Sequence, residues 1–301
     1  MKHYLAFDIG GTQIKYGIVS EEGKVVTSFQ ADTEAHKGGQ SVVEKVIRLG
    51  NELMQAYSIE GIGISTLGLV DADNGVVLGG CENIPHYAGI QLKQLVSGAL
   101  DVPVEVENDV NCVGLAESWI GAGNNVNNFI ALTIGTGVGG AIIINGELYR
   151  GRGFSAGEWG YMIVEGKAFE HVASITGLCQ LAAHYKGENV QSGKEVFDLY
   201  DQGDEKIKLA VQLFFKHLAI GISNLIYIFN PEKVIIGGGV TARGEVFVQE
   251  LNVEIEKYLL PDFQKQTDIV LASSSNHAGM IGGVHHFINK QALQEKTQRN
   301  V

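Results

Sequence analysis

A polar tripeptide, Glu107-Asn108-Asp109, closes one apolar run and opens a helix-like one. A carboxylate at such a corner can accept a proton from an attacking hydroxyl group, as a base does in phosphoryl transfer. Asn108 offers both a donor and an acceptor to sugar hydroxyls. The competing interpretation is structural, because Asn and Asp before a helix are common N-caps. Taken alone, the tripeptide favours the cap.

Two glycine-rich turns suggest phosphate binding. Asp8-Ile9-Gly10-Gly11-Thr12 lies between two strand-like runs, and Gly135-Thr136-Gly137 repeats that arrangement. Glycines let backbone N–H groups approach a phosphate, Thr12 adds a hydroxyl, and Asp8 can hold a metal ion directly or through water. Lys15 can add positive charge. A plain β-hairpin would explain either turn alone, but two such turns in one chain favour phosphate binding.

Two further motifs carry a weaker signal. Gly157-Glu158-Trp159-Gly160-Tyr161 offers a carboxylate for sugar hydroxyls and aromatic rings for the C–H face of a sugar, and a surface turn with Trp159 in the core is the alternative. Gly237-Gly238-Gly239 follows a buried strand and permits close approach of an adenine or a ribose. A tight strand-to-helix turn explains it equally well.

The elements that must position these motifs repeat along the chain. Strands are expected at residues 4–9, 14–20, about 24–29, 61–66 and 104–110, and helices at about 41–57, 208–229 and 278–288. The segment DIGGTQIKYGIV has a counterpart in TIGTGVGGAIII, since both read as strand, glycine turn and strand. This repetition favours two related α/β lobes whose phosphate turns face a shared cleft.

Composition restricts the function further. The chain has 301 residues, 40 glycines and a formal net charge of −12, without a Lys/Arg block, so nucleic acid is a poor partner and small molecules are expected. The three cysteines are widely spaced and indicate neither a disulfide framework nor a zinc knuckle. We expect no signal peptide and no membrane-spanning run, hence a cytoplasmic location.

Taken together, the ordered motifs DIGGT, END, LTIGTGVGGAIIINGELYRG, AGEWGY and IIGGG resemble the ROK family of sugar kinases, within the actin- and hexokinase-like ATPase superfamily. The resemblance runs from Asp8 to about His286. It implies an α/β fold of two ribonuclease H-like lobes with a cleft between them. The smaller lobe would comprise residues 1–117 plus 282–301, and the larger lobe residues 118–281.

The resemblance also implies roles, with ATP, Mg²⁺ and a sugar as ligands and a homodimer as the assembly. Asp109 would be the catalytic base, and Asp8 would lie near Mg²⁺. The sugar would be held by Asn83, Asn108, Asp109, Glu158 and Glu170. The nucleotide would be held by Asp8, Gly10, Gly11, Thr12, Lys15, Gly135, Thr136, Gly137, Gly238 and Gly239.

The sequence departs from most ROK kinases at one place. Their zinc segment has no counterpart here: Tyr161 stands where they have a histidine, the cysteines are absent, and the stretch to Glu170 is short. No structural zinc is expected. This pattern is similar to bacterial β-glucoside kinases, which implies phosphorylation of the 6-hydroxyl of a glucosyl unit in β-glucosides such as cellobiose.

Two alternatives stay open, and a third is disfavoured. The first is a glucokinase or another hexose or N-acetylmannosamine kinase, and the retained Glu170 favours it because this carboxylate could recognise a free anomeric hydroxyl. The second is a non-catalytic sugar-sensing ROK protein, against which the presence of Asp109 and both glycine turns argues. A transcriptional regulator is disfavoured by the net charge of −12 and by the seven residues that precede Asp8.

Overall fold

The structure, a computed structural model, describes residues 1–299. The chain divides into two compact units. The first contains residues 1–124, 150–155 and the described residues from 274 onward, and the second contains residues 125–149 and 156–273. The second unit thus begins later than the expected residue 118, because helix α3 (Asp109–Ile120) packs against α10 (Ala278–Arg299) in the first. Since α10 is one continuous helix, the expected break at residue 282 would have divided it.

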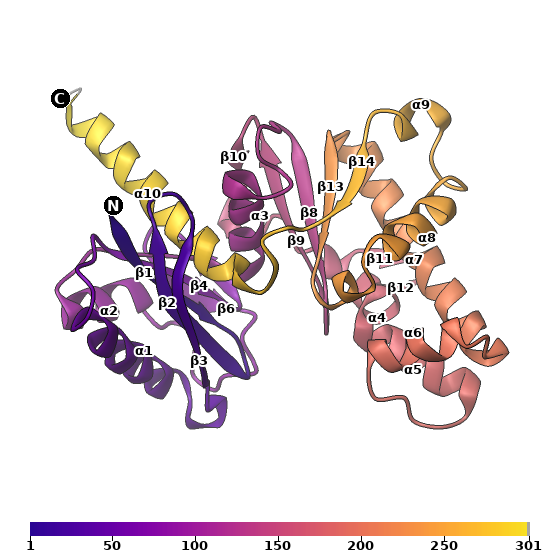
Figure 1. The fold of residues 1–301 in the computed structure, drawn as a ribbon, viewed down its shortest axis with the longest axis horizontal. Helices are drawn as coiled ribbons and strands as arrows, with labels where there is room; N and C mark the ends of the chain where they lie inside the picture. Colours follow the sequence, from indigo (N-terminus) through magenta and orange to yellow (C-terminus); the bar gives the residue numbers. More distant parts are fainter. Residues whose placement is uncertain (300–301) are drawn as a thin grey trace. The chain divides into compact units, whose positions relative to one another are not determined.

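The first unit is built on a five-stranded sheet with strand order β3-β2-β1-β4-β7. Figure 1 labels β1, β2, β3 and β4 of this sheet. Strands β1, β2 and β3 pair antiparallel, whereas β4 and β7 continue the sheet in parallel. The sheet strands are β1 (His3–Ile9), β2 (Gln13–Ser20), β3 (Val25–Asp32), β4 (Ile62–Thr66) and β7 (Val104–Asn108), and the small hairpin is β5 (Leu69–Asp71) and β6 (Val76–Gly79). The other helices are α1 (Gly39–Met54), α2 (Leu92–Leu100) and the short 3₁₀ turns 35–37, 152–154 and 275–277.

Apolar side chains alternate along these strands and bury both faces of the sheet. One cluster joins Phe7, Ile9 and Ile64 to residues of α1 and α2 such as Val46 and Val96. The other joins Tyr4 and Ala6 to α10. The helix approaches β4 so closely that a Cβ on Gly63 would lie 2.4 Å from the carbonyl carbon of Gly283. Small residues are therefore required where α10 crosses the sheet.

The second unit repeats the same strand arrangement, with order β10-β9-β8-β13-β14. Again three strands pair antiparallel and two follow in parallel. Its strands are β8 (Phe129–Ile134), β9 (Val138–Ile144), β10 (Glu147–Leu148), β13 (Lys233–Gly237), β14 (Asp268–Leu271) and the hairpin β11 (Ile163–Val164) and β12 (Lys167–Ala168). Its helices are α4 (Phe169–Ala173), α5 (Ile175–Lys186), α6 (Gly193–Asp201), α7 (Glu205–Phe229), α8 (Glu245–Ile255), α9 (Pro261–Gln264) and the 3₁₀ turns 159–161 and 239–243.

The match between the two sheets extends the internal repeat from one hairpin to all five strands. The α/β class with two ribonuclease H-like units is confirmed, since each unit has three antiparallel strands continued by two parallel ones. In each unit the glycine turn connects the first two strands of this pattern. The fold therefore places both predicted phosphate turns at equivalent positions.

Helix α7 corrects one expectation. By length and composition alone it could cross a bilayer, so the prediction that no run is long and apolar enough is wrong. However, 67% of its most apolar 18-residue window is buried, and it packs against α4, α5, α6 and α8. Its apolar residues thus form the core of the second unit.

Candidate functional site

The first glycine turn is held rigidly by its neighbours in the first unit. The Gly10 N–H donates to the Gln13 carbonyl at 3.0 Å, and the Thr33 hydroxyl donates to the Gly10 carbonyl at 2.6 Å. Asn83 lies next to the turn, because a Cβ on Gly11 would lie 3.4 Å from the Asn83 Cβ. The structure thus brings Asn83, a predicted sugar ligand, against the predicted phosphate turn.

Asp8 lies at the end of β1 with both carboxylate oxygens near polar groups. Ser65 Oγ donates to Oδ1 at 2.8 Å, and Lys15 Nζ lies 3.7 Å from Oδ2. Lys15 is itself held by a 2.8 Å hydrogen bond to Asn276 Oδ1. Burial raises the pKa of the Asp8 carboxyl, against the lowering effect of Ser65 and Lys15. A Cβ on Gly279 would lie 2.3 Å from Asp8 Oδ1, so the first turn of α10 requires a glycine at this position.

This carboxylate fits a magnesium ion of the kind that accompanies nucleotides. Such an ion is usually held by one or two carboxylates together with waters and phosphates. Asp8 supplies one carboxylate, with Oδ2 engaged only at the longer distance to Lys15. Within residues 1–299, no group of three His, Cys, Asp or Glu side chains is placed to hold a metal ion. Phosphate oxygens would have to complete the coordination.

Asn108 and Asp109 form the corner between β7 and α3. Asn108 is the N-cap of α3: its Oδ1 accepts from the N–H groups of Val110 at 2.9 Å and Asn111 at 3.0 Å. Its Nδ2 donates to the Gly68 carbonyl and to Asp109 Oδ1, both at 2.9 Å. The structural interpretation of Asn108 is therefore confirmed. The same side chain also fixes Asp109, so the two interpretations are compatible.

Sequence reasoning missed the buried group beneath this corner. Glu107 Oε2 accepts from Arg150 Nε at 2.7 Å, and Arg150 Nη2 lies 2.6 Å from the same oxygen. Glu107 Oε1 accepts from the Asn108 N–H at 2.8 Å and from Asn111 Nδ2 at 3.0 Å. The position of Glu107 inside the END motif was a signal, whereas Arg150 lies 43 residues away and had none.

In the second unit, the turn Gly135-Thr136-Gly137 is joined to the start of α5 and to Glu170. The Ile175 N–H donates to the Gly135 carbonyl at 2.8 Å. A Cβ on Gly137 would lie 2.8 Å from Glu170 Oε2, whereas a Cβ on Gly135 would have no heavy atom within 4 Å among the described residues. Glu170, a predicted sugar ligand, therefore lies directly beside the second predicted phosphate turn.

The segment 157–161 divides its two aromatic side chains between core and surface. Trp159 is buried and lies over Gly140, so the alternative that placed it in the core is confirmed. Tyr161 is 69% exposed. Glu158 reaches solvent, yet the pKa of its carboxyl is raised, first by partial burial and then by the negative charge of Glu170. An exposed aromatic ring thus accompanies two mutually repelling carboxylates.

The third glycine motif adjoins a pocket of about 330 Å³ in the second unit. Gly238 has φ of 86°, a backbone conformation that favours glycine. Gly239 lines the pocket together with Ile175, Val240 and Phe197. The Arg243 guanidinium lies 4.6 Å from the centre of the Phe197 ring and pairs with Asp201 and Glu250. The volume and the mixture of apolar and charged groups suit a nucleoside.

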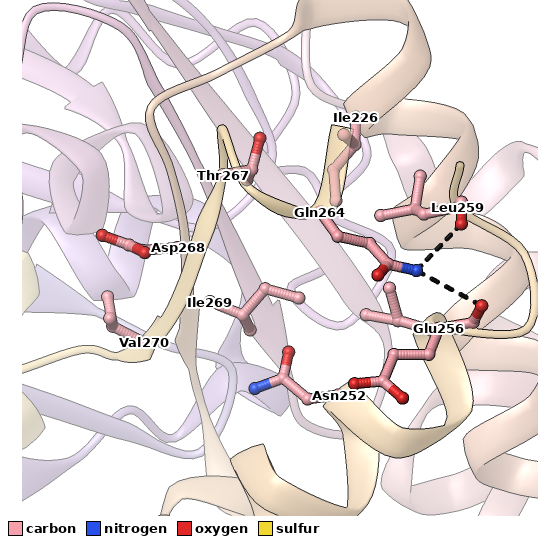
Figure 2. Close-up of a pocket in the computed structure, with 10 residues that line it drawn as sticks. Ile226, Asn252, Glu256, Leu259, Gln264, Thr267, Asp268, Ile269 and Val270 are labelled. Carbon is pink, nitrogen blue, oxygen red and sulfur yellow. Dashed lines mark hydrogen bonds between the residues drawn. The ribbon is translucent and has the colours of Figure 1, made fainter. Parts of the chain in front are cut away.

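Two other pockets in this unit differ in their relation to the motifs. One of about 350 Å³ is lined by Thr136, Ile175 and Cys179 and therefore borders the second predicted phosphate turn. The other, of about 420 Å³, lies between α8 and β14, where Gln264 Nε2 donates to the carbonyls of Leu259 and Glu256 (Figure 2). This second pocket contains none of the predicted site residues.

The predicted residues thus form one group in each unit. The first unit holds Asp8, Gly10, Gly11, Thr12, Lys15, Asn83, Asn108 and Asp109. The second holds Gly135, Thr136, Gly137, Glu158, Glu170, Gly238 and Gly239. Within its own unit, each group contains a glycine turn and at least one carboxylate.

Known proteins resemble the chain over nearly its full length. A β-glucoside kinase of Listeria monocytogenes is 35% identical to the chain over 96% of its length and 99% of the relative's. A Streptomyces griseus ROK glucokinase, solved with glucose and AMPPNP, superposes with a TM-score of 0.79 at 27% identity and covers 93% of this chain and 97% of its own. A Streptococcus pneumoniae ROK protein solved with sucrose superposes with a TM-score of 0.86 at 26% identity, covering 97% and 99%. The model of the ROK family matches residues 4–290, and the chain belongs to that family.

Proposed function

We propose that this chain is an ATP-dependent sugar kinase that phosphorylates the 6-hydroxyl of a glucosyl unit, with β-glucosides such as cellobiose as its substrates. The observation that carries the proposal is the corner at Asn108 and Asp109. There a carboxylate at the first turn of a helix is held by the side chain of the helix cap. A base for phosphoryl transfer must be held in this way to meet an incoming hydroxyl.

In this reaction Asp109 accepts the proton of the sugar hydroxyl. The hydroxyl oxygen forms a bond to the γ-phosphorus, the bond to the bridging oxygen of ATP breaks, and ADP leaves. Phosphoryl transfer requires little covalent chemistry from the protein, so catalysis depends on positioning the reactants and on stabilising charge in the transition state. The fixed geometry of Asn108 and Asp109 provides the positioning.

The nucleotide would be held by the two glycine turns. Gly10, Gly11 and Thr12, and likewise Gly135, Thr136 and Gly137, would offer backbone N–H groups to the phosphates. The pocket beside Gly239 would take the adenosine. Asp8 would hold Mg²⁺, which when bound neutralises charge on the phosphate oxygens. Lys15, anchored by Asn276, would add a second positive charge nearby.

The sugar would be recognised by Asn83, Glu158 and Glu170. Asn108, the fourth predicted ligand, already uses both Nδ2 hydrogens and both acceptor positions of Oδ1 within the fold, so its role would be to orient Asp109. The Listeria β-glucoside kinase and the sucrose-bound Streptococcus protein favour a disaccharide, and the exposed Tyr161 ring offers a surface for its second sugar. The glucose-bound Streptomyces enzyme favours the alternative of a glucokinase. We further propose a cytoplasmic homodimer, and light scattering after gel filtration would measure its mass.

The decisive experiment measures ADP release with Mg-ATP and a panel of glucose, cellobiose, gentiobiose, fructose and N-acetylmannosamine. We expect turnover on cellobiose and gentiobiose, and a loss of about 10³-fold or more in kcat with Asp109→Asn, since the base is removed. Turnover on monosaccharides alone would replace the β-glucoside assignment by the glucokinase one. An absence of turnover on every sugar, with sugar binding retained, would favour a sensor.

A further inference from the structure

Two buried carboxylates lie on the same face of strand β7 in the first unit. Glu105 and Glu107 are each 1% exposed, and each is paired with one cation. Lys93 Nζ lies 2.8 Å from both oxygens of Glu105, while Arg150 contacts a single oxygen of Glu107 through Nε and Nη2. An unpaired buried charge is strongly destabilising, so each cation stabilises its carboxylate in the fold.

The two pairs differ in what the carboxylate holds. Both oxygens of Glu105 are engaged by Lys93. Glu107 instead divides its oxygens: Oε2 accepts from Arg150, and Oε1 accepts from the Asn108 N–H and from Asn111 Nδ2. Glu107 therefore connects Arg150 to the backbone immediately before Asp109 and to the first turn of α3.

A third group fixes the plane of the guanidinium. Arg150 Nη2 lies 3.2 Å from Nδ1 of His286, which is 3% exposed on α10. Burial and the positive charge of Arg150 hold the pKa of His286 well below its usual range, so the ring is neutral and Nδ1 accepts. Its Nε2 has no hydrogen-bond partner among residues 1–299. Arg150 thus spans two acceptors, which a lysine ammonium could not match with the same geometry.

Arg150 also lies at a particular place in the chain. It is the first residue of the segment 150–155, which belongs to the first unit although the residues on both sides belong to the second. Seven residues further on, this segment leads to the turn that carries Glu158. The contact with Glu107 therefore fixes the point from which the chain continues to a predicted sugar ligand.

From these contacts we infer that Glu107 and Arg150 are positioning residues for phosphoryl transfer. Arg150 holds Glu107, and Glu107 holds the backbone that orients Asp109, without either side chain contacting the substrate. This inference rests on the proposed function, because it takes Asp109 as the base. It also predicts that the Glu105–Lys93 pair, which has similar burial, has no such role.

The test compares Arg150→Ala and Arg150→Lys with the matched control Lys93→Ala in the full chain. Each variant is assayed for kcat, for KM of ATP and of the sugar, and for its unfolding midpoint. We expect both alanine variants to lower the midpoint. Only the two Arg150 variants should also lower kcat, by about 10- to 100-fold, as the displacement of a catalytic group does. The KM of ATP should change less than about twofold in the same variants, since uniform binding is retained.

Chemical rescue separates positioning from general stability. Millimolar guanidinium should restore part of the kcat of Arg150→Ala and none of that of Lys93→Ala. Wild-type kcat in Arg150→Lys, equal losses in Arg150→Ala and Lys93→Ala, or an absence of rescue would each overturn the inference. If the wild type turns over no sugar, the proposed function fails first. If Asp109→Asn retains activity, the assignment of the base fails, and the positioning role fails with it. If Asp109→Asn is inactive while Arg150→Lys is not, only the positioning role fails.

Discussion

Asn108 Nδ2 donates a 2.9 Å hydrogen bond to Oδ1 of Asp109, while the Oδ1 of the same amide caps helix α3. One side chain thus ends the strand, starts the helix and holds the proposed base. The helix cap depends on Oδ1, and the orientation of Asp109 depends on Nδ2, which also donates to the Gly68 carbonyl. Substitutions that keep one end and change the other can therefore separate the two.

Asn108→Asp keeps the cap, because aspartate caps helices about as well as asparagine. It replaces the donor Nδ2 with a second carboxylate oxygen that repels Asp109. We expect the unfolding free energy to fall by about 1 to 3 kcal/mol, because the cap remains but the hydrogen bond to the Gly68 carbonyl is lost. The kcat should fall at least about tenfold, as expected when a base loses its orientation. Asn108→Ser, which caps without adding charge, is the control. Unchanged kcat in both variants would refute an orienting role for Nδ2.

Gly135→Ala tests the second phosphate turn. Within the described residues a Cβ there meets no atom within 4 Å, so the fold should accept it with an unchanged melting temperature. A bound phosphate would meet it, so KM for ATP should rise about tenfold or more, given how closely such turns approach phosphates. Gly79→Ala is the control, since a Cβ there also lies in open space. An unchanged KM for ATP would argue against phosphate binding at this turn.

The raised pKa of Glu158 gives a pH dependence to sugar binding. Burial and the charge of Glu170 favour the protonated form, so Glu158 loses its charge at a higher pH than an ordinary glutamate. If the carboxylate accepts from sugar hydroxyls, KM for the sugar should rise as the pH falls through this raised value. Glu170→Gln removes the neighbouring charge and should move the rise to lower pH. Identical pH profiles of KM in both proteins would exclude the coupling.

His285 contributes an acid-sensitive component to stability. Burial lowers its pKa to about 4, and its ring lies 4.8 Å from Trp119 with Nδ1 unpaired within the part of the chain that the structure describes. The histidine of the unfolded chain titrates near pH 6.5, whereas the buried ring of the folded protein stays neutral to about pH 4. The contribution of His285 to the free energy of unfolding should therefore be fully present above pH 6.5 and should fall progressively towards pH 4. His285→Phe keeps an aromatic ring at this position and removes both the titrating group and the unpaired Nδ1. The free energy of unfolding at pH 5 should therefore rise by about 1 kcal/mol. Denaturant titrations at pH 7.5 and pH 5 measure this, and equal slopes with pH in both proteins would contradict it.

Tyr161→Ala asks whether the exposed ring contacts a second sugar. Because the side chain is 69% exposed, the melting temperature should not change. KM for cellobiose should rise several-fold, because the loss of one aromatic contact costs about 1 kcal/mol of binding free energy. The kinetic constants with glucose should stay the same. Ile163→Ala, on a neighbouring side chain of 68% exposure, is the matched control. Equal effects on both sugars would remove Tyr161 from disaccharide recognition.

Local patterns predicted the framework of the fold. The glycine turns and the apolar runs beside them predicted both hairpins, and helical spacing predicted α7 from residue 208. The helix in fact begins at Glu205, because Asp204 caps it by accepting from the Lys206 and Ile207 N–H groups. A polar cap precedes the apolar pattern, so periodicity alone could not locate it.

Contacts between distant segments could not be predicted. Glu170 lies beside Gly137, and Arg150 pairs with Glu107 across 43 residues, yet neither pairing leaves a local pattern. The last helix was expected to end near residue 288, although it continues to Arg299, since its polar second half gives no apolar periodicity. In each case the missing information is the tertiary packing that brings distant segments together, and local sequence patterns do not encode it.

The position of α10 has a consequence for biosynthesis. This helix completes the core that includes Tyr4 and Ala6 on β1, so β1 waits for a helix translated much later before one side of its sheet is covered. The second unit, by contrast, lies wholly before Ser274 and can fold while the chain is still being extended. Until α10 has been translated, the nascent first unit therefore exposes an apolar sheet face, and we expect it to depend most on chaperones during this interval.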